Sequence, residues 1–143
     1  MSASHADVLV IGAGSAGMSA GYYLARRGAR VLLIDAFDPP HREGSHHGET
    51  RLIRHAYKKG SAYIPLALRA DELWRELERE AETELLVRSG VINIADPEHY
   101  SFRNRPDDAR AFGVPVEMLD AAEMRRRWPG LALPDHFIGM YEP

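Results

Sequence analysis

The sequence predicts an α/β fold that opens with a Rossmann-like β-α-β unit and continues into the start of an α+β domain with antiparallel strands. Two apolar runs, Val8–Ile11 and Val31–Asp35, flank a helical segment, Gly14–Arg27. A glycine-rich turn joins the first run to that segment, and the acid Asp35 closes the second run. Later apolar runs alternate with turn residues and amphipathic stretches, a pattern typical of a mixed domain.

Local signals define the β-α-β unit in order. Val8–Ile11 is a continuous apolar run of the kind found in buried parallel strands. The helix Gly14–Arg27 stops at Gly28, which suits a helix end because glycine readily adopts a left-handed conformation. The strand Val31–Asp35 then runs parallel to the first, and we expect the usual right-handed crossover between them.

The composition changes after the second strand. The segment from Phe37 to Gly48 contains two prolines, a serine and three histidines, so we expect an irregular loop. From Ala62 to Ala81, apolar side chains recur at helical spacing with charged side chains between them. This spacing predicts an amphipathic helix.

The following apolar runs predict antiparallel strands. Leu85–Val87 and Val91–Ile94 flank the turn pair Ser89-Gly90, an arrangement typical of a β-hairpin. We therefore expect these two runs to pair with each other.

The final stretch predicts one strand and two short helices. Pro97–Phe112 is expected to hold a loop and an amphipathic helix, and Val116–Leu119 a short strand. Asp120–Glu123 has the pattern of a capping box that starts a helix reaching about Trp128. Prolines keep the remaining residues extended.

The predicted elements do not complete a doubly wound sheet. Parallel strands need neighbours, and helices on both faces, to bury their apolar sides. We therefore expect the chain to be incomplete. Residues 1–84 would form the N-terminal part of a nucleotide-binding domain, and residues 85–143 the first segment of a substrate domain.

The composition excludes several classes of protein. Charged residues make up 27% of the 143 residues and hydrophobic ones 45%, as in ordinary soluble domains. The formal net charge of −3 gives no reason to expect nucleic acid or an anionic membrane as partner. The sequence contains no cysteine, which excludes disulfides and thiolate chemistry within these residues. We expect no membrane span and, without an export signal, a cytoplasmic location.

The glycine-rich turn predicts a dinucleotide site. Gly12, Gly14 and Gly17 have the spacing that lets a backbone approach a pyrophosphate. The helix Gly14–Arg27 would offer the free N–H groups of its N-terminus to the phosphates. Asp35 ends the second strand, where a carboxylate can accept a hydrogen bond from a ribose hydroxyl.

A second motif is more specific than the glycines. The segments Asp35–His41 and Gly44–Tyr57 resemble those of the flavin-dependent amine oxidases of the monomeric sarcosine oxidase and N-methyltryptophan oxidase family. The resemblance continues through Tyr63–Arg69, Ser89–Val91 and Arg127–Gly130, and so covers essentially the whole sequence.

The resemblance implies a glutathione-reductase-like nucleotide domain with FAD as the cofactor. The residues that it assigns to FAD are Gly12, Gly14, Ser15, Gly17, Asp35, Ser45, His46 and Arg51. It also implies an active site at His47, Arg51 and Arg54, beside the flavin ring. Arg54 would hold a substrate carboxylate, and Arg51 and His47 would shape the charge around the flavin.

The implied activity is the oxidation of a secondary amine, typically an N-methyl amino acid such as sarcosine, with O2. The products would be an imine, hydrolysed to formaldehyde and an amino acid, and hydrogen peroxide. We expect little turnover from these 143 residues alone. The alternative is a non-catalytic FAD-binding fragment, or a subunit that needs a separate C-terminal partner. An NAD-dependent dehydrogenase is a weaker alternative, because the histidine–arginine loop has no place in it.

Some side chains have simpler interpretations. From spacing alone, Arg51 and Arg54 would also fit surface ion pairs with Glu49 or Glu72.

The histidines of this region do not predict a metal centre. Adjacent His46 and His47 lack a third ligand at useful spacing, so no metal is expected. His41 and His55 are expected to be structural.

Overall fold

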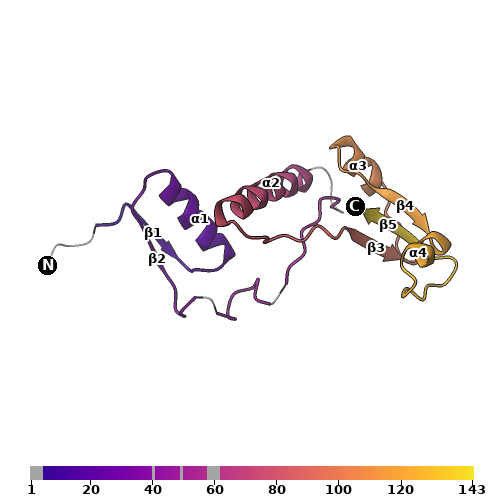
Figure 1. The fold of residues 1–143 in the computed structure, drawn as a ribbon, viewed down its shortest axis with the longest axis horizontal. Coiled ribbons are helices and arrows are strands. Elements are labelled where there is room, and N and C mark those ends of the chain that lie inside the picture. The colour runs from indigo at the N-terminus through magenta and orange to yellow at the C-terminus, as the bar shows by residue number, and fades with distance from the viewer. Residues whose placement is uncertain (1–4, 40, 49, 58–61) are drawn as a thin grey trace. The chain divides into compact units, whose positions relative to one another are not determined.

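The computed structural model describes residues 5–39, 41–48, 50–57 and 62–143, and divides the chain into two units, Met1–Leu52 and Ile53–Pro143 (Figure 1). Within these described residues, no helix is both long enough and apolar enough to cross a membrane.

The first unit is the predicted β-α-β unit. It consists of β1 (Val8–Ile11), α1 (Ser15–Arg26) and β2 (Val31–Ile34). The strands pair in parallel, with Val8 opposite Val31 and Ile11 opposite Ile34. This confirms the expected order of elements and the parallel pairing.

Two glycines let α1 lie close to the strands. A Cβ atom on Gly21 would lie 3.8 Å from Cγ1 of Val31, and one on Gly17 would lie 3.5 Å from Cγ1 of Val10. These valines therefore face the helix. On the opposite side of the two strands, Leu9 and Ile11 are exposed to solvent.

The second unit contains an antiparallel sheet and three helices among its described residues (Figure 1). Its elements are α2 (Tyr63–Ala81), β3 (Val91–Ala95), α3 (Arg105–Ala111), β4 (Glu117–Asp120), α4 (Ala121–Arg127) and β5 (Ile138–Glu142). The strand order is β3-β5-β4, so the strand that comes last in sequence is the central one. In register, Asn93 lies opposite Met140 and Leu119 lies opposite Gly139.

Each face of this sheet has its own apolar cluster. One cluster joins Met140 of β5 to Ile64 of α2 and Ala109 of α3. The other joins Leu119 to Met124 of α4, with Trp128 and Tyr141 packed against it. Side chains of β5 alternate between the two clusters because successive residues of a strand point to opposite faces.

The helix α4 begins as the sequence predicts. The carboxylate of Asp120 accepts a hydrogen bond from the backbone N–H of Glu123 at 2.8 Å. This contact satisfies one of the free N–H groups in the first turn.

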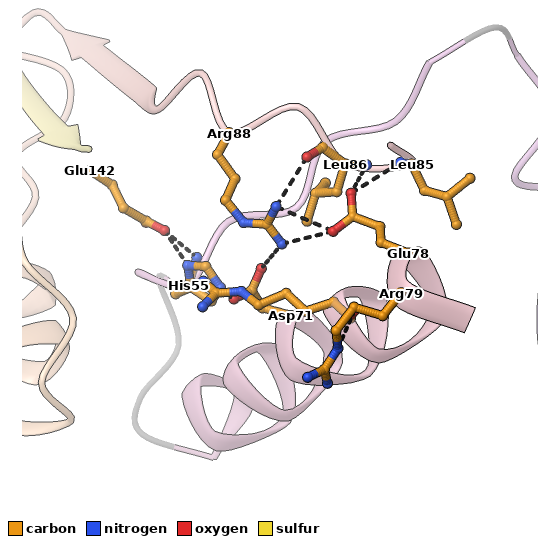
Figure 2. A network of polar contacts seen from close by, with 9 residues as sticks. His55, Asp71, Glu78, Arg79, Leu85, Leu86, Arg88 and Glu142 are labelled. Atoms are coloured by element: carbon orange, nitrogen blue, oxygen red, sulfur yellow. Dashed lines mark hydrogen bonds and ion pairs between the residues drawn. The ribbon is translucent and has the colours of Figure 1, made fainter. Parts of the chain in front are cut away.

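The predicted hairpin is wrong in one of its two strands. Leu85–Val87 forms no strand; instead, the N–H groups of Leu85 and Leu86 donate to Oε1 of Glu78 at 3.0 and 2.8 Å (Figure 2). Val91–Ala95 is a strand, but its partner is Ile138–Glu142. A carboxylate at the end of α2 therefore satisfies backbone groups that the hairpin would have paired.

The final residues were expected only to be extended, and they form the centre of the sheet instead. The signal in Ile138–Glu142 is weakened by Gly139, which is a poor strand residue. A Cβ atom on Gly139 would collide with Sδ of Met124 on α4, so a larger residue there would force the Met124 side chain to move. The domain boundary between residues 84 and 85 stays a prediction.

Candidate functional site

The glycine-rich turn lies between β1 and α1 and has the shape that its sequence predicts. Gly12 has a φ angle of +100°, and its N–H donates to the carbonyl of Ile34 at 2.7 Å. A Cβ atom on Gly17 would collide with the carbonyl oxygen of Gly12. The helix therefore starts so close to the turn that only glycine fits at position 17.

The N-cap residue of α1 supplies no side-chain hydrogen bond to the helix. Gly14 occupies the N-cap position and has no side chain to accept from the helix. The N–H of Ser15 donates to Nδ1 of His46 at 3.3 Å. The first turn contains no acidic residue, so the positive end of the helix dipole is not neutralised within the turn.

Asp35 follows β2 and lies against this turn. Its Oδ1 accepts from the N–H of Phe37 at 2.9 Å, and its Oδ2 from the N–H of Ala13 at 2.6 Å. Nε2 of His41 lies 3.3 Å from Oδ1. The hydrogen bond from the N–H of Phe37 and, to a smaller extent, the one from the N–H of Ala13 lower the pKa of Asp35 below its usual value. The carboxylate is therefore ionised at neutral pH, and Oδ2, which accepts from Ala13, keeps a lone pair for another donor.

The histidine loop belongs to the same unit as the glycine turn. Gly44–His47 forms a turn closed by the N–H of His47, which donates to the carbonyl of Gly44 at 3.0 Å. This turn contains Ser45 and places His46 against the start of α1. The guanidinium of Arg51 donates to the carbonyl oxygens of His47 and Thr50. The hydrogen bond between Ser15 and His46 thus joins the histidine loop to the start of α1 within the first unit.

Arg54 lies in the second unit. Its guanidinium carbon lies 5.6 Å from the centre of the Tyr57 ring, and the residue is exposed. A shared site of Arg54 with His47 and Arg51 stays a prediction.

The ion pairs of Arg51 and Arg54 that the spacing allowed involve Glu49 or Glu72. Glu72 accepts from Arg69 at 2.6 Å. Glu49 lies outside the described residues. Across the part of the chain that is described, no three His, Asp or Glu side chains are grouped to hold a metal ion.

One polar contact was missed by sequence reasoning. Glu142 on β5 accepts from both the backbone N–H and Nδ1 of His55, at 2.8 and 2.6 Å (Figure 2). His55 thus has a partner 87 positions further along the sequence, and its expected structural role stays a prediction. A signal was present, since Glu142 is the one acid in the apolar stretch that becomes β5.

Residues 7–143 match the protein family described as DAO, FAD dependent oxidoreductase. The chain belongs to this family. The fold agrees with the match, because a parallel β-α-β unit is followed by an antiparallel sheet in the structure. The resemblance drawn from the histidine–arginine loop is thereby confirmed.

Two curated relatives show how much of a longer protein this chain covers. The chain is 46% identical over 141 residues to the monomeric sarcosine oxidase of Bacillus sp. (strain B-0618), covering 98% of this chain and 36% of that protein. It is 49% identical over 136 residues to the N-methyl-L-tryptophan oxidase of Citrobacter koseri, covering 95% and 37%. The chain thus spans little more than a third of the length of these relatives.

Solved structures support the fold of this DAO-family chain. NikD, an unusual amino acid oxidase essential for nikkomycin biosynthesis, superposes with a TM-score of 0.80 at 26% identity, over 96% of this chain and 36% of NikD. The L-proline dehydrogenase from P. horikoshii gives a TM-score of 0.76 at 24% identity, over 96% of this chain and 36% of that protein. The second likeness concerns the fold alone.

The residues of the first unit fit the phosphates and ribose of FAD. The collision that a Cβ on Gly17 would cause shows how tightly turn and helix approach, as a pyrophosphate cradle requires. The start of α1 suits an anion because its first turn contains no acidic residue, and the ionised Asp35 suits a hydroxyl donor. The predicted contacts of each residue with FAD stay predictions.

Proposed function

We propose that this chain forms the FAD-binding part and the carboxylate-binding arginine of an oxidase that acts on secondary amines such as N-methyl amino acids. The observation that carries the proposal is the 46% identity with a monomeric sarcosine oxidase over 98% of this chain. That similarity includes the glycine turn and the histidine–arginine loop, where the proposed chemistry is placed. Sarcosine and N-methyl-L-tryptophan are the two substrates to compare, because they match the two relatives.

The residues of the first unit would bind and orient the cofactor. Gly12, Gly14 and Gly17 leave room for the pyrophosphate, and the N–H of Ser15 would donate to it in place of His46. Asp35 would accept from the ribose. When bound, FAD supplies the two-electron acceptor that takes a hydride from the amine and passes electrons to O2, giving hydrogen peroxide.

The arginines would bind charge on the substrate and near the flavin ring. Arg54 is exposed, always protonated and planar, so it can bind a carboxylate through two parallel hydrogen bonds. Holding the carboxylate there would direct the N-methyl carbon of the substrate toward the flavin. Arg51 and His47 would place positive charge and a donor near the ring, where negative charge develops during the reaction.

FAD titration of the purified chain tests the cofactor half of the proposal. We expect saturable one-to-one binding, which is measured through the quenching of flavin fluorescence. Gly14→Val, which puts methyl groups in front of the helix start, and Asp35→Ala should each weaken binding about tenfold or more. Asp38→Ala, an exposed acid of the same loop, is the matched control and should bind as the parent chain does. Equal affinity in all four proteins would contradict the assignment.

Activity is tested by complementation. The part of the Bacillus sarcosine oxidase beyond the matched residues is added as a separate polypeptide, and peroxide is measured with sarcosine and with N-methyl-L-tryptophan. We expect turnover that depends on both polypeptides. Arg54→Lys should raise KM about tenfold, because lysine cannot form the paired hydrogen bonds. Firm FAD binding without any peroxide would favour the alternative, a non-catalytic FAD-binding fragment.

A further inference from the structure

We propose that Glu142 is a positioning residue that fixes the backbone directly after Arg54 and so holds this arginine ready for the substrate carboxylate. The inference rests on the proposed function of Arg54 and goes beyond it by naming what orders that arginine. Glu142 lies on the central strand β5, far from Arg54 in sequence. It binds the two residues that follow Arg54.

Both carboxylate oxygens of Glu142 are used. Oε1 accepts from the backbone N–H of His55 at 2.8 Å and from its Nδ1 at 2.6 Å (Figure 2). Oε2 accepts from the backbone N–H of Ala56 at 3.0 Å. Glu142 is only 5% exposed, so these bonds form largely away from water, where an unpaired carboxylate would be unfavourable.

A second buried side chain holds the same peptide segment from its carbonyl side. Nε of Arg105, at the start of α3, donates to the carbonyl oxygen of Ala56 at 2.6 Å. Arg105 is also buried, and its Nη2 lies 3.4 Å from Oδ1 of Asn93 on β3. Ala56 itself is completely buried in the apolar cluster with Ile64 and Met140. Residues 55 and 56 are thus held by charged groups from β5 and α3.

The contacts of Glu142 and Arg105 with residues 55 and 56 are called the clamp below. They fix the backbone next to Arg54, whose side chain stays exposed. Tyr57, on the other side of the clamped residues, has its ring centre 5.6 Å from the Arg54 guanidinium carbon and 5.7 Å from the Tyr63 ring centre. The backbone on one side of Arg54 and an aromatic neighbour of its guanidinium are therefore both fixed. A binding group held in this way loses less freedom when its ligand arrives.

An apolar side chain at position 142 would be simpler if packing were its only purpose. Replacing a buried charged group with a well-packed apolar one is often neutral or stabilising. The carboxylate of Glu142 is instead directed at three donors of one dipeptide. This directional contact fixes the position and orientation of the segment, which nonpolar packing specifies less strictly.

The first test measures the clamp without activity. Amide hydrogen exchange is followed in the full chain, in Glu142→Gln and in the control Glu117→Gln. Glu117 is an acid of β4 in the same sheet and pairs with Arg127 of α4 at 2.7 Å. In Glu142→Gln, an amide group would face donors that need an acceptor, so exchange at Ala56 should rise about tenfold or more. Exchange at Met140 should stay within about twofold, and Glu117→Gln should change neither. Unchanged exchange at Ala56 in Glu142→Gln would overturn the inference.

The second test measures the effect on carboxylate recognition in the complemented protein. Glu142→Gln should raise both KM for sarcosine and the inhibition constant of acetate about tenfold, with kcat within about twofold. A merely structural role would lower the amount of active protein and leave both constants unchanged, and that result would overturn positioning. If the parent protein binds FAD but never forms peroxide, the proposed function fails, and the positioning role fails with it. If the parent protein forms peroxide and only Glu142→Gln has changed constants for sarcosine and acetate, the proposed function stands.

His55→Gln is a milder variant in case Glu142→Gln does not fold. It removes the ring bond to Glu142 and leaves both backbone donors in place. We expect about a threefold rise in the same two constants, again with little change in kcat. If Ala56 exchanges faster in His55→Gln while both constants keep their parent values, the link between the clamp and Arg54 is contradicted.

Discussion

At the scale of single residues, the closest approach in the first unit decides which side chains its turn tolerates. Gly17 belongs to α1, yet a methyl group there would meet the carbonyl of Gly12. We predict that Gly17→Ala lowers the free energy of unfolding of this unit by about 1–3 kcal/mol, because turn and helix must separate. Gly130→Ala in the second unit, where a methyl group would meet nothing within 4 Å, should change the free energy of unfolding of that unit by less than about 0.5 kcal/mol.

Hydrogen exchange of the strand amides in β1 and β2 measures this prediction. FAD affinity should fall in the same variant, since the cradle depends on that approach. A Gly17→Ala protein with parent stability and parent FAD affinity would show that the turn relaxes without consequence.

Residue types near the turn were largely predictable, whereas the partners of the polar side chains were not. The glycine spacing identified Gly12 and Gly17 because both are constrained by contacts a few residues apart. Nothing local indicated that Glu142 would bind His55, because that contact depends on a fold that brings together two residues 87 positions apart in the sequence. Long-range polar pairs of this kind leave only a weak trace, an acid inside an apolar run.

At the scale of elements, α4 illustrates how charge stabilises a short helix. Glu123 accepts from Arg126 at 2.7 and 2.8 Å and from Arg127 at 2.6 Å. Arg126, then Arg127, lower the pKa of Glu123 from 4.5 to about 2. A carboxyl whose pKa is lower in the folded state stabilises the fold above its unfolded pKa, and this contribution is lost as the pH falls.

We predict that α4 loses stability between about pH 4.5 and pH 2, the interval between the two pKa values of Glu123. Exchange of the α4 amides, followed across this range, measures the loss. Glu123→Gln cannot ionise and should remove this part of the pH dependence, while Glu98→Gln, exposed in another loop, should keep it. An identical pH profile in Glu123→Gln would show that these contacts do not stabilise the helix.

Elements with local signals were predicted well, and those that depend on distant partners were not. The helix at Tyr63–Ala81 follows from its own spacing, and α4 from its capping acid, Asp120. Leu85–Val87 has the composition of a strand but gives its N–H groups to Glu78. The true partner of β3 was hidden because Gly139 interrupts its apolar pattern.

At the scale of the whole molecule, the cofactor residues and the tryptophans lie in different units. The predicted nucleotide residues from Gly12 to Arg51 belong to the first unit, whereas Trp74 and Trp128 belong to the second. We predict that FAD at 100 times its Kd stabilises the first unit by about 2.7 kcal/mol.

Exchange of the β2 amides reports the first unit, and urea unfolding followed by tryptophan fluorescence reports the second. FAD should therefore stabilise the second unit, as measured by the urea midpoint, less than it stabilises the first unit, as measured by exchange. An equal shift in both would show that the two units unfold as one, and no shift in either would contradict a nucleotide site in this chain.

The central position of β5 has a consequence for biosynthesis. Among the described residues, β3 and β4 pair only with β5, so this pairing must wait until the ribosome has added the residues through Glu142. While residues 96 to 142 are being added, the nascent chain therefore carries strand edges that still lack the partner β5, and such edges favour pairing with other chains. Translation that pauses before Ile138 would prolong this exposure, so the demand for chaperones during synthesis falls on the stretch between β4 and β5.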